Sequence, residues 1–288
     1  YHFVGANVGV MHGESQRRGY RKTLAAAQRD GLRVVRVWAF GERSVNASRW
    51  LRRWQAFRIG PRGWVPAAGR HLDRVMAEAG KRGLRVILVL GNNWSDYGGV
   101  PQYLRWAKLS PGGFAQRDRF YRHPRTRRWY RAHLTRLLGR RNAYTGRRYA
   151  ADPTIFAWEL LNESNVTPAG FAGRRQFITE MAGLIRRHAP NHLVAAGVTG
   201  YDSLARRAEW LRVCRLPGVS YCDAHLYPEE TWRLRRPADL DRQIDDAQRD
   251  REAEIEDRRG VSADTRIMSA GSRSGRNPTI GCNGQQAV

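Results

Sequence analysis

Two segments of the sequence share one design, in which a helix ends at a glycine and an apolar strand begins within a few residues. They are residues 30–35 (DGLRVV) and residues 82–87 (RGLRVI). Glycine readily adopts the left-handed conformation that closes a helix. A continuous apolar strand is typical of a parallel sheet that is covered by helices on both faces. The repeated unit therefore predicts an α/β fold that is built from successive βα pairs.

The same alternation extends over most of the chain. We predict strands at residues 3–7, 34–40, 86–90, 155–161, 193–196 and 219–226, and helices at residues 20–30, 72–82, 129–138 and 174–188. Six such strands fit either a closed barrel or an open doubly wound sheet. No glycine-rich phosphate turn follows the first strand, whereas polar or aromatic residues follow nearly every strand. This favours a (β/α)8 barrel, the TIM barrel, whose active sites lie at the carboxyl ends of the strands.

Residues 236–288 differ in composition from the rest of the chain. They include a charge-dense stretch at 241–259 and a stretch rich in Gly, Ser and Asn at 269–288, and neither predicts a strand. A closed barrel needs eight strands to remove its edges. We therefore divide the chain into a barrel body at residues 1–235 and a tail at residues 236–288, with the last two strands unclear or missing.

The formal net charge is +25, which is typical of proteins that bind polyanions. However, the basic residues include only three lysines, Lys22, Lys81 and Lys108, and the many arginines are scattered through predicted helices and loops. A scattered excess of arginine indicates biased residue usage rather than a binding surface, so we expect no specific nucleic-acid partner. A barrel that serves only as a polyanion-binding scaffold remains an alternative, which a steep loss of DNA affinity with salt would support.

The chain contains three cysteines, Cys214, Cys222 and Cys282. Their spacing matches no metal site, and an odd number cannot form a closed set of disulfides. Cys214 and Cys222 either form one disulfide or remain two buried thiols. No run of about 18 apolar residues predicts a transmembrane helix, and residues 1–4 are typical of a strand rather than of a signal peptide.

The most informative motif is the run DPTIFAWELLNE at residues 152–163. A buried strand leads there directly into Asn162 and Glu163, which places an amide and a carboxyl at the mouth of the predicted barrel. An Asn-Glu pair in this position either caps the helix that follows or carries out chemistry. Taken alone, the pair favours the cap.

Further motifs in a fixed order favour chemistry instead. They are VRVWAF at residues 35–40, NNW at 92–94, YGG at 97–99, RNAYTG at 141–146 and AHLYP at 224–228, followed by Trp232. Together with residues 152–163, they resemble the β-mannanases of glycoside hydrolase family 5 over roughly residues 1–235. The resemblance implies a secreted, monomeric (β/α)8 barrel that hydrolyses β-mannan as a retaining endo-β-1,4-mannanase, without a metal or an organic cofactor and without a membrane partner.

The resemblance also implies roles for individual residues. Glu163 is the catalytic acid/base, because a glycosidic oxygen leaves readily only once it is protonated. Asn162 holds the 2-hydroxyl of the sugar, and Arg36 keeps the nucleophile ionised through charge-assisted hydrogen bonds. The other matched positions contact the sugar or orient the nucleophile, and they are Trp38, Asn93, Trp94, His225, Tyr227 and Trp232.

The nucleophile departs from the family pattern, in which a glutamate ends the seventh strand and a tryptophan ends the eighth. After Trp232, the glutamates are Glu252, Glu254 and Glu256, all in a polar stretch that predicts a solvated helix. Glu256 is the nearest positional candidate for the nucleophile. The sequence leaves open a catalytically inactive carbohydrate-binding relative that lacks the nucleophile, and a β-1,4-glucanase of the same family.

Overall fold

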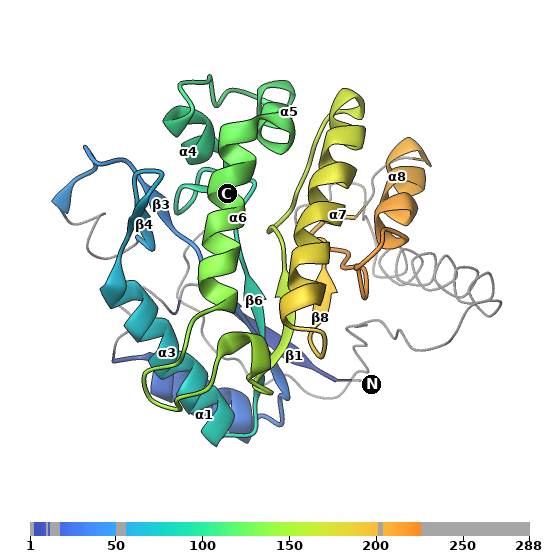
Figure 1. The fold of residues 1–288 in the computed structure, drawn as a ribbon. Coiled ribbons are helices and arrows are strands. Elements are labelled where there is room, and N and C mark those ends of the chain that lie inside the picture. The colour runs from blue at the N-terminus through green and yellow to red at the C-terminus, as the bar shows by residue number, and fades with distance from the viewer. Residues whose placement is uncertain (1–2, 10, 12–17, 50–55, 201–203, 226–288) are drawn as a thin grey trace, which may run out of the picture.

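A five-stranded parallel sheet forms the centre of the fold (Figure 1). The computed structural model describes residues 3–9, 11, 18–49, 56–200 and 204–225. In order across the sheet, the strands are β1 (Gly5–Gly9), β2 (Val34–Trp38), β6 (Arg85–Val89), β7 (Ile155–Glu159) and β8 (Leu193–Ala195). Each strand pairs in parallel with the next main strand along the chain, as the strands of a (β/α)8 barrel do.

The sixth predicted strand, residues 219–226, is described as far as residue 225. This part lies beside β8 as expected and pairs with it at one residue. Tyr221 forms an isolated parallel bridge with Ala195. The Ser220 N–H donates to the Val194 carbonyl at 2.8 Å. The Val194 N–H in turn donates to the Ser220 hydroxyl at 2.8 Å, so a side chain replaces the backbone carbonyl that would extend the ladder. The predicted seventh and eighth strands and the domain boundary at residue 235 lie outside the described residues.

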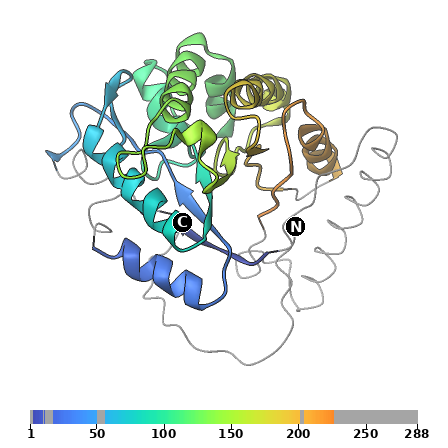
Figure 2. The same cartoon turned by 60° about the horizontal axis from the view of Figure 1, so that its bottom comes forward.

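Helices follow the strands and cover the outside of the sheet. They are α1 (Tyr20–Arg29), α3 (Pro66–Lys81), α4 (Gly99–Trp106), α5 (Phe114–Arg122), α6 (Pro124–Leu138), α7 (Phe171–His188) and α8 (Leu204–Cys214), with the short 3-10 helices η2 (Tyr149–Ala151) and η3 (Pro168–Gly170). Figure 2 shows α1, α3, α6, α7 and α8 one after another around the sheet in chain order. The predicted alternation of strands and helices is therefore confirmed.

Local sequence explains where these helices begin and end. Gly31 and Gly83 follow α1 and α3 with φ angles of 72° and 70°, as the repeated design predicts. Helix α6 begins at Pro124 rather than at residue 129. Its start is stabilised because the His123 ring accepts the Arg125 N–H at 3.3 Å, and because proline at the first helical position has no N–H to satisfy.

A second, small sheet lies in the connection between β2 and α3, and the sequence did not predict it. Its strands are β3 (Glu42–Arg43), β4 (Arg58–Ile59) and β5 (Gly63–Trp64), which pair parallel and then antiparallel. Helices α4 and α5 were not predicted either. Glu42 on β3 accepts the Gly99 N–H of α4, and Phe114 on α5 packs edge-on against Trp94, which follows β6.

Side chains of the main sheet alternate between its two faces. Val35, Val37 and Leu88 belong to the large core between the sheet and the helices. The inner face has a separate apolar cluster made of Val34, Ile87, Ala157, Ala195 and Tyr221. Because side chains alternate with a period of two, the next inward positions are Arg36 on β2 and Glu159 on β7. A charged layer therefore follows the apolar layer toward the carboxyl ends of the strands.

Candidate active site

Asn162 and Glu163 lie where the carboxyl ends of β6 and β7 meet. Strand pairing continues past both strands through a parallel bridge between Asn92 and Asn162. The Asn162 N–H donates to the Gly91 carbonyl at 2.8 Å, and the Asn162 carbonyl accepts the Asn93 N–H at 3.0 Å. Glu163 then adopts a φ of 55°, a left-handed conformation that is uncommon for a residue with a side chain. Such a conformation persists only where the surrounding structure fixes it, which is frequent at functional sites.

The Glu163 carboxyl contacts two of the predicted site residues. The Trp94 indole Nε1–H donates to Glu163 Oε2 at 2.5 Å. The His225 Nδ1 lies 2.9 Å from Glu163 Oε1, and only 10% of the Glu163 side chain is exposed. Trp94, predicted as a residue that contacts sugar, thus also holds the carboxyl of the predicted acid/base. Its ring packs edge-on against Phe114 at 5.8 Å between centroids.

Arg36 connects β2 to β7 through a buried carboxylate. Its Nε and Nη2 donate to Glu159 Oε2 and Oε1 at 2.7 and 2.5 Å, and Nη2 also donates to Asn162 Oδ1 at 2.8 Å. Burial opposes the charge of Arg36, but the Glu159 carboxylate outweighs it and raises the pKa of the guanidinium. Glu159 was not among the residues predicted from the sequence. A glutamate inside the apolar run at residues 155–161 was the available signal, because a buried charge requires a partner.

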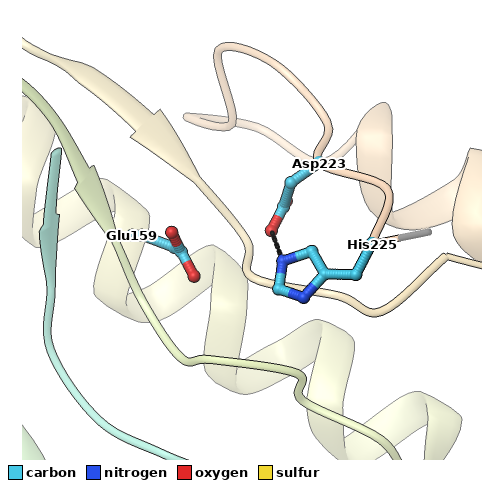
Figure 3. Close-up of side chains that lie close together, drawn as sticks. All are labelled: Glu159, Asp223 and His225. Carbon is cyan, nitrogen blue, oxygen red and sulfur yellow. Dashed lines mark ion pairs between the residues drawn. The ribbon is translucent and has the colours of Figure 1, made fainter. Parts of the chain in front are cut away.

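His225 lies among three carboxylates, from Glu163, Asp223 and Glu159. Its Nε2 is 3.7 Å from Asp223 Oδ2, and Figure 3 shows the ring between Asp223 and Glu159. Burial opposes a charge on this ring, but the carboxylates of Asp223 and Glu163 dominate and raise the pKa of His225 to about 10. His225 is therefore an imidazolium near neutral pH, and its Nδ1–H donates to Glu163. Asp223 was also missed, although it precedes the predicted His225 by two residues.

The structure gives the Trp38 side chain aromatic packing contacts, whereas the Asn93 side chain has no hydrogen bond in the described part of the chain. The half-buried Trp38 ring stacks on Phe40 at 4.9 Å and meets Tyr97 edge-on at 5.6 Å between centroids. The Asn93 side chain is fully buried, and neither of its amide atoms has a hydrogen-bond partner in the described part of the chain. A contact between Asn93 and sugar stays a prediction. Tyr227, Trp232 and Glu256 lie outside the described residues.

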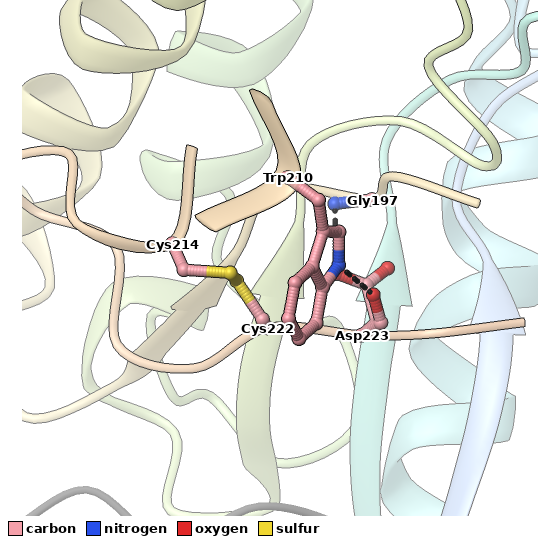
Figure 4. The surroundings of a disulfide bond; sticks show 5 residues. All are labelled: Gly197, Trp210, Cys214, Cys222 and Asp223. Carbon is pink, nitrogen blue, oxygen red and sulfur yellow. Dashed lines mark hydrogen bonds between the residues drawn. A yellow bond between two sulfur atoms is a disulfide. The ribbon is translucent and has the colours of Figure 1, made fainter. Parts of the chain in front are cut away.

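A disulfide joins Cys214 at the end of α8 to Cys222 (Figure 4). Of the two alternatives that the sequence left open, the structure has the bridge rather than two thiols. Cys282 lies outside the described residues. The bridge ties α8 to the segment that carries Asp223 and His225.

Glu159, Asp223 and His225 are the one group in the described ranges whose side-chain atoms are close enough to hold a metal ion, within 4.8 Å of one another. Both oxygens of Glu159 are already bonded by Arg36, and His225 Nδ1 donates to Glu163. We therefore interpret the group as an ion-pair network. None of the described helices is long and apolar enough to cross a bilayer.

Comparison with known proteins places this geometry in a family. A family model described as glycoside hydrolase family 5, β-mannosidase-like, matches residues 1–266. The chain belongs to glycoside hydrolase family 5. Mannan endo-1,4-β-mannosidase 1 of Oryza sativa subsp. japonica is 32% identical over 232 residues, which cover 75% of this chain and 52% of that protein. Mannan endo-1,4-β-mannosidase 7 of Arabidopsis thaliana is 30% identical over 235 residues, which cover 77% of this chain and 52% of that protein.

Solved structures confirm the fold of this family 5 chain. The endo-β-1,4-mannanase of Thermotoga petrophila superposes with a TM-score of 0.69 at 30% identity, over 78% of this chain and 52% of that one. The endo-1,4-β-mannanase of Rhizomucor miehei gives 0.69 at 23% identity, over 87% and 74%. The predicted (β/α)8 barrel class is thus confirmed. The chain spans about half the length of the curated relatives that it matches.

Proposed function

We propose that this chain belongs to a retaining endo-β-1,4-mannanase in which Glu163 is the catalytic acid/base. One observation supports this most: Glu163 stands at the carboxyl end of β7 with each carboxyl oxygen bonded, one by the Trp94 indole and one by His225. Both donors belong to motifs that resemble the β-mannanases. The names of the relatives support β-mannan, a polysaccharide, as the substrate.

The reaction needs two carboxyl groups with different tasks. Glu163 protonates the glycosidic oxygen while a carboxylate about 5 to 5.5 Å away attacks the anomeric carbon and forms a glycosyl-enzyme. The ionised Glu163 then removes a proton from water, which attacks the same carbon and releases the sugar. Asn162 supports the first step. Its Nδ2 donates one hydrogen to Asn92 Oδ1 at 3.0 Å, and its second hydrogen serves the sugar 2-hydroxyl.

Glu256 is the nucleophile in this proposal. The described carboxylates beside Glu163 are Glu159 and Asp223, which come from β7 and from the segment after β8, whereas the family nucleophile ends the seventh strand. Glu256 lies within the match to the family model, in the order that the family requires. Tyr227, Trp232 and Trp38 are proposed to line the sugar-binding cleft.

We further propose that the protein is secreted and monomeric, with no nucleic-acid partner. The Cys214–Cys222 disulfide supports an oxidising compartment, because such bonds persist outside the cytosol.

The first experiment measures release of reducing ends from β-mannan, with carboxymethyl cellulose as the control substrate. We expect Glu163→Gln to lower mannan hydrolysis by about 100-fold or more, because protonation of the leaving oxygen is lost. A dinitrophenyl β-mannobioside separates the steps, since dinitrophenolate leaves without protonation. The variant should still release a burst of dinitrophenolate. Glu78→Gln is the matched control, because Glu78 is paired with Arg82 on α3.

The outcome also decides between the proposal and its main alternative. Mannan hydrolysis that Glu163→Gln leaves unchanged would refute the role of Glu163. A protein that binds mannan and has a native circular dichroism spectrum, but releases no reducing ends, would instead be a catalytically inactive carbohydrate-binding relative. Hydrolysis of carboxymethyl cellulose in preference to mannan would indicate a β-1,4-glucanase. Glu256→Gln then tests the nucleophile in the same assays.

A further inference from the structure

We propose that Asp223 is a positioning residue of this active site, whose carboxylate holds His225 as an imidazolium directed at Glu163. The inference rests on the proposed function, since it takes Glu163 as the acid/base. Asp223 acts through His225 and does not itself touch the sugar in this proposal.

The position of Asp223 follows from the layers inside the sheet. Tyr221 belongs to the inner apolar cluster, and Asp223 and His225 follow it at intervals of two residues. Carboxylate oxygens of Glu159 and Asp223 and a ring nitrogen of His225 all lie within 4.8 Å of one another. Asp223 therefore shares the charged layer with Arg36 and Glu159, and His225 lies beside it (Figure 3). The His225 Nδ1 meets Glu163 Oε1 at 2.9 Å.

Three contacts fix the position of Asp223 (Figure 4). Its Oδ1 accepts the Gly197 N–H at 3.2 Å. Its backbone carbonyl accepts the Trp210 indole N–H at 3.1 Å. The residue before it, Cys222, is bonded to Cys214 on α8. An aspartate that is held at its side chain, its backbone and its neighbour is suited to orienting a second side chain.

Gly197 connects Asp223 directly to the backbone that carries the acid/base. Its carbonyl accepts the N–H of Ser164, the residue after Glu163, at 2.7 Å. Gly197 has a φ of 74°, and a Cβ atom there would lie 1.5 Å from the Leu161 carbonyl oxygen, so only glycine fits. The N–H and the carbonyl of one residue therefore set where Asp223 lies relative to Glu163.

The three carboxylates around His225 are placed differently, and Asp223 is the one that faces the Nε2 side of the ring. Arg36 neutralises Glu159 through two hydrogen bonds, and Glu163 meets the Nδ1 side of the ring. Asp223 is the anion on the Nε2 side, at 3.7 Å. With both ring nitrogens protonated, the Nδ1–H donates to Glu163 Oε1 while Trp94 donates to Oε2. The two donors fix the plane of the Glu163 carboxylate, the form of this residue that removes a proton from water in the second step.

The test follows the protonation of His225 by nuclear magnetic resonance on protein with 15N-labelled histidine. The His225 signal is assigned from its loss in His225→Gln. We expect Asp223→Asn to lower the pKa of His225 by about 1 to 3 units, because one neighbouring anion is lost. The asparagine oxygen can still accept the Gly197 N–H. Asp30→Asn is the matched control, since Asp30 is exposed and its loss changes the net charge equally.

A His225 pKa that is the same in wild type and Asp223→Asn would overturn the proposal, as would a neutral His225 in the wild type at pH 7. If Asp223→Asn does not fold, Asp223→Thr gives the same comparison, because its hydroxyl also accepts the Gly197 N–H. Mannan turnover forms a second measurement: Asp223→Asn should lower kcat more than it changes KM. Because the resonance measurement needs no turnover, it stands even if the chain proves inactive on mannan.

Discussion

Glu42 is a fully buried carboxyl whose ionisation should make stability depend on pH. Its Oε2 accepts the Gly99 N–H at 3.1 Å, and its own N–H donates to the Tyr97 carbonyl at 2.7 Å. Burial raises the pKa of Glu42 to about 7, although the charge of Arg58 and the Gly99 N–H oppose the increase. We predict that Glu42→Gln gains stability relative to the wild type as pH rises through this value.

The direction and the size of this change in the free energy of unfolding follow from proton linkage. In the unfolded chain, a glutamate ionises near its ordinary pKa of 4.5, whereas Glu42 in the folded protein ionises at about 7. Between these values the folded state keeps a proton that the unfolded state has lost, so the free energy of unfolding decreases as pH rises. One pKa unit corresponds to about 1.4 kcal/mol, and the loss therefore amounts to about 3 kcal/mol.

Urea unfolding of wild type and Glu42→Gln at several values between about pH 4 and pH 8 measures this loss. The free energy of unfolding of the variant, minus that of wild type, should rise by about 3 kcal/mol over this range. Contributions from other titrating groups cancel in the difference. Glu78→Gln is the control, and loss of its surface ion pair should change stability by less than about 1 kcal/mol. A difference for Glu42→Gln that stays constant with pH would refute the reasoning.

Two further predictions concern buried polar groups. His133 is fully buried. Burial, and to a smaller extent the nearby charge of Arg58, lowers the pKa of His133 from 6.5 to about 3. The stability that this neutral ring contributes above pH 6.5 is therefore lost as pH falls toward 3. His133→Gln should remove about 5 kcal/mol of this acid dependence in the same urea assay, and an unchanged acid dependence would contradict it. Asp73 accepts two hydrogen bonds from Arg140, at 2.7 and 2.6 Å, and one from Tyr149 at 2.8 Å. Asp73→Ala should lower the free energy of unfolding by about 3 to 5 kcal/mol, whereas a loss below about 1 kcal/mol would show that this buried network contributes little.

Much of the site could be predicted because the order of the strands in the sequence fixes which residues meet at the carboxyl edge of the sheet. Parallel strands place their carboxyl ends at one edge of the sheet, so Arg36 and the Asn162–Glu163 pair, which are far apart in sequence, were expected together. The structure has Arg36 bonded to Asn162, and Glu163 follows Asn162 directly. His225 was expected in the same place from a strand that turns out to be a single bridge, because its neighbours still lie beside β8.

The pairing of buried charges could not be predicted from the sequence. Glu159 and Asp223 looked like irregularities within apolar segments, and their partners, Arg36 and His225, come from other segments of the fold. The direction of the Trp94 indole was missed for a similar reason, since an aromatic ring after a strand either faces the cleft or donates its N–H. The β3–β5 sheet has strands of two residues each, too short for any periodic pattern.

The hydrogen bonds of Arg36 to β7 leave room for its predicted partner, the nucleophile. A guanidinium has five N–H groups. Glu159 and Asn162 take three of them, on Nε and Nη2, and Asn7 Oδ1 accepts one from Nη1 at 3.3 Å. The other Nη1 hydrogen has no acceptor among the residues that the structure describes. The bidentate pair with Glu159 therefore does not compete with the predicted role of Arg36. It fixes the guanidinium plane, so that the remaining N–H has a defined direction in which to meet the nucleophile that the family resemblance implies.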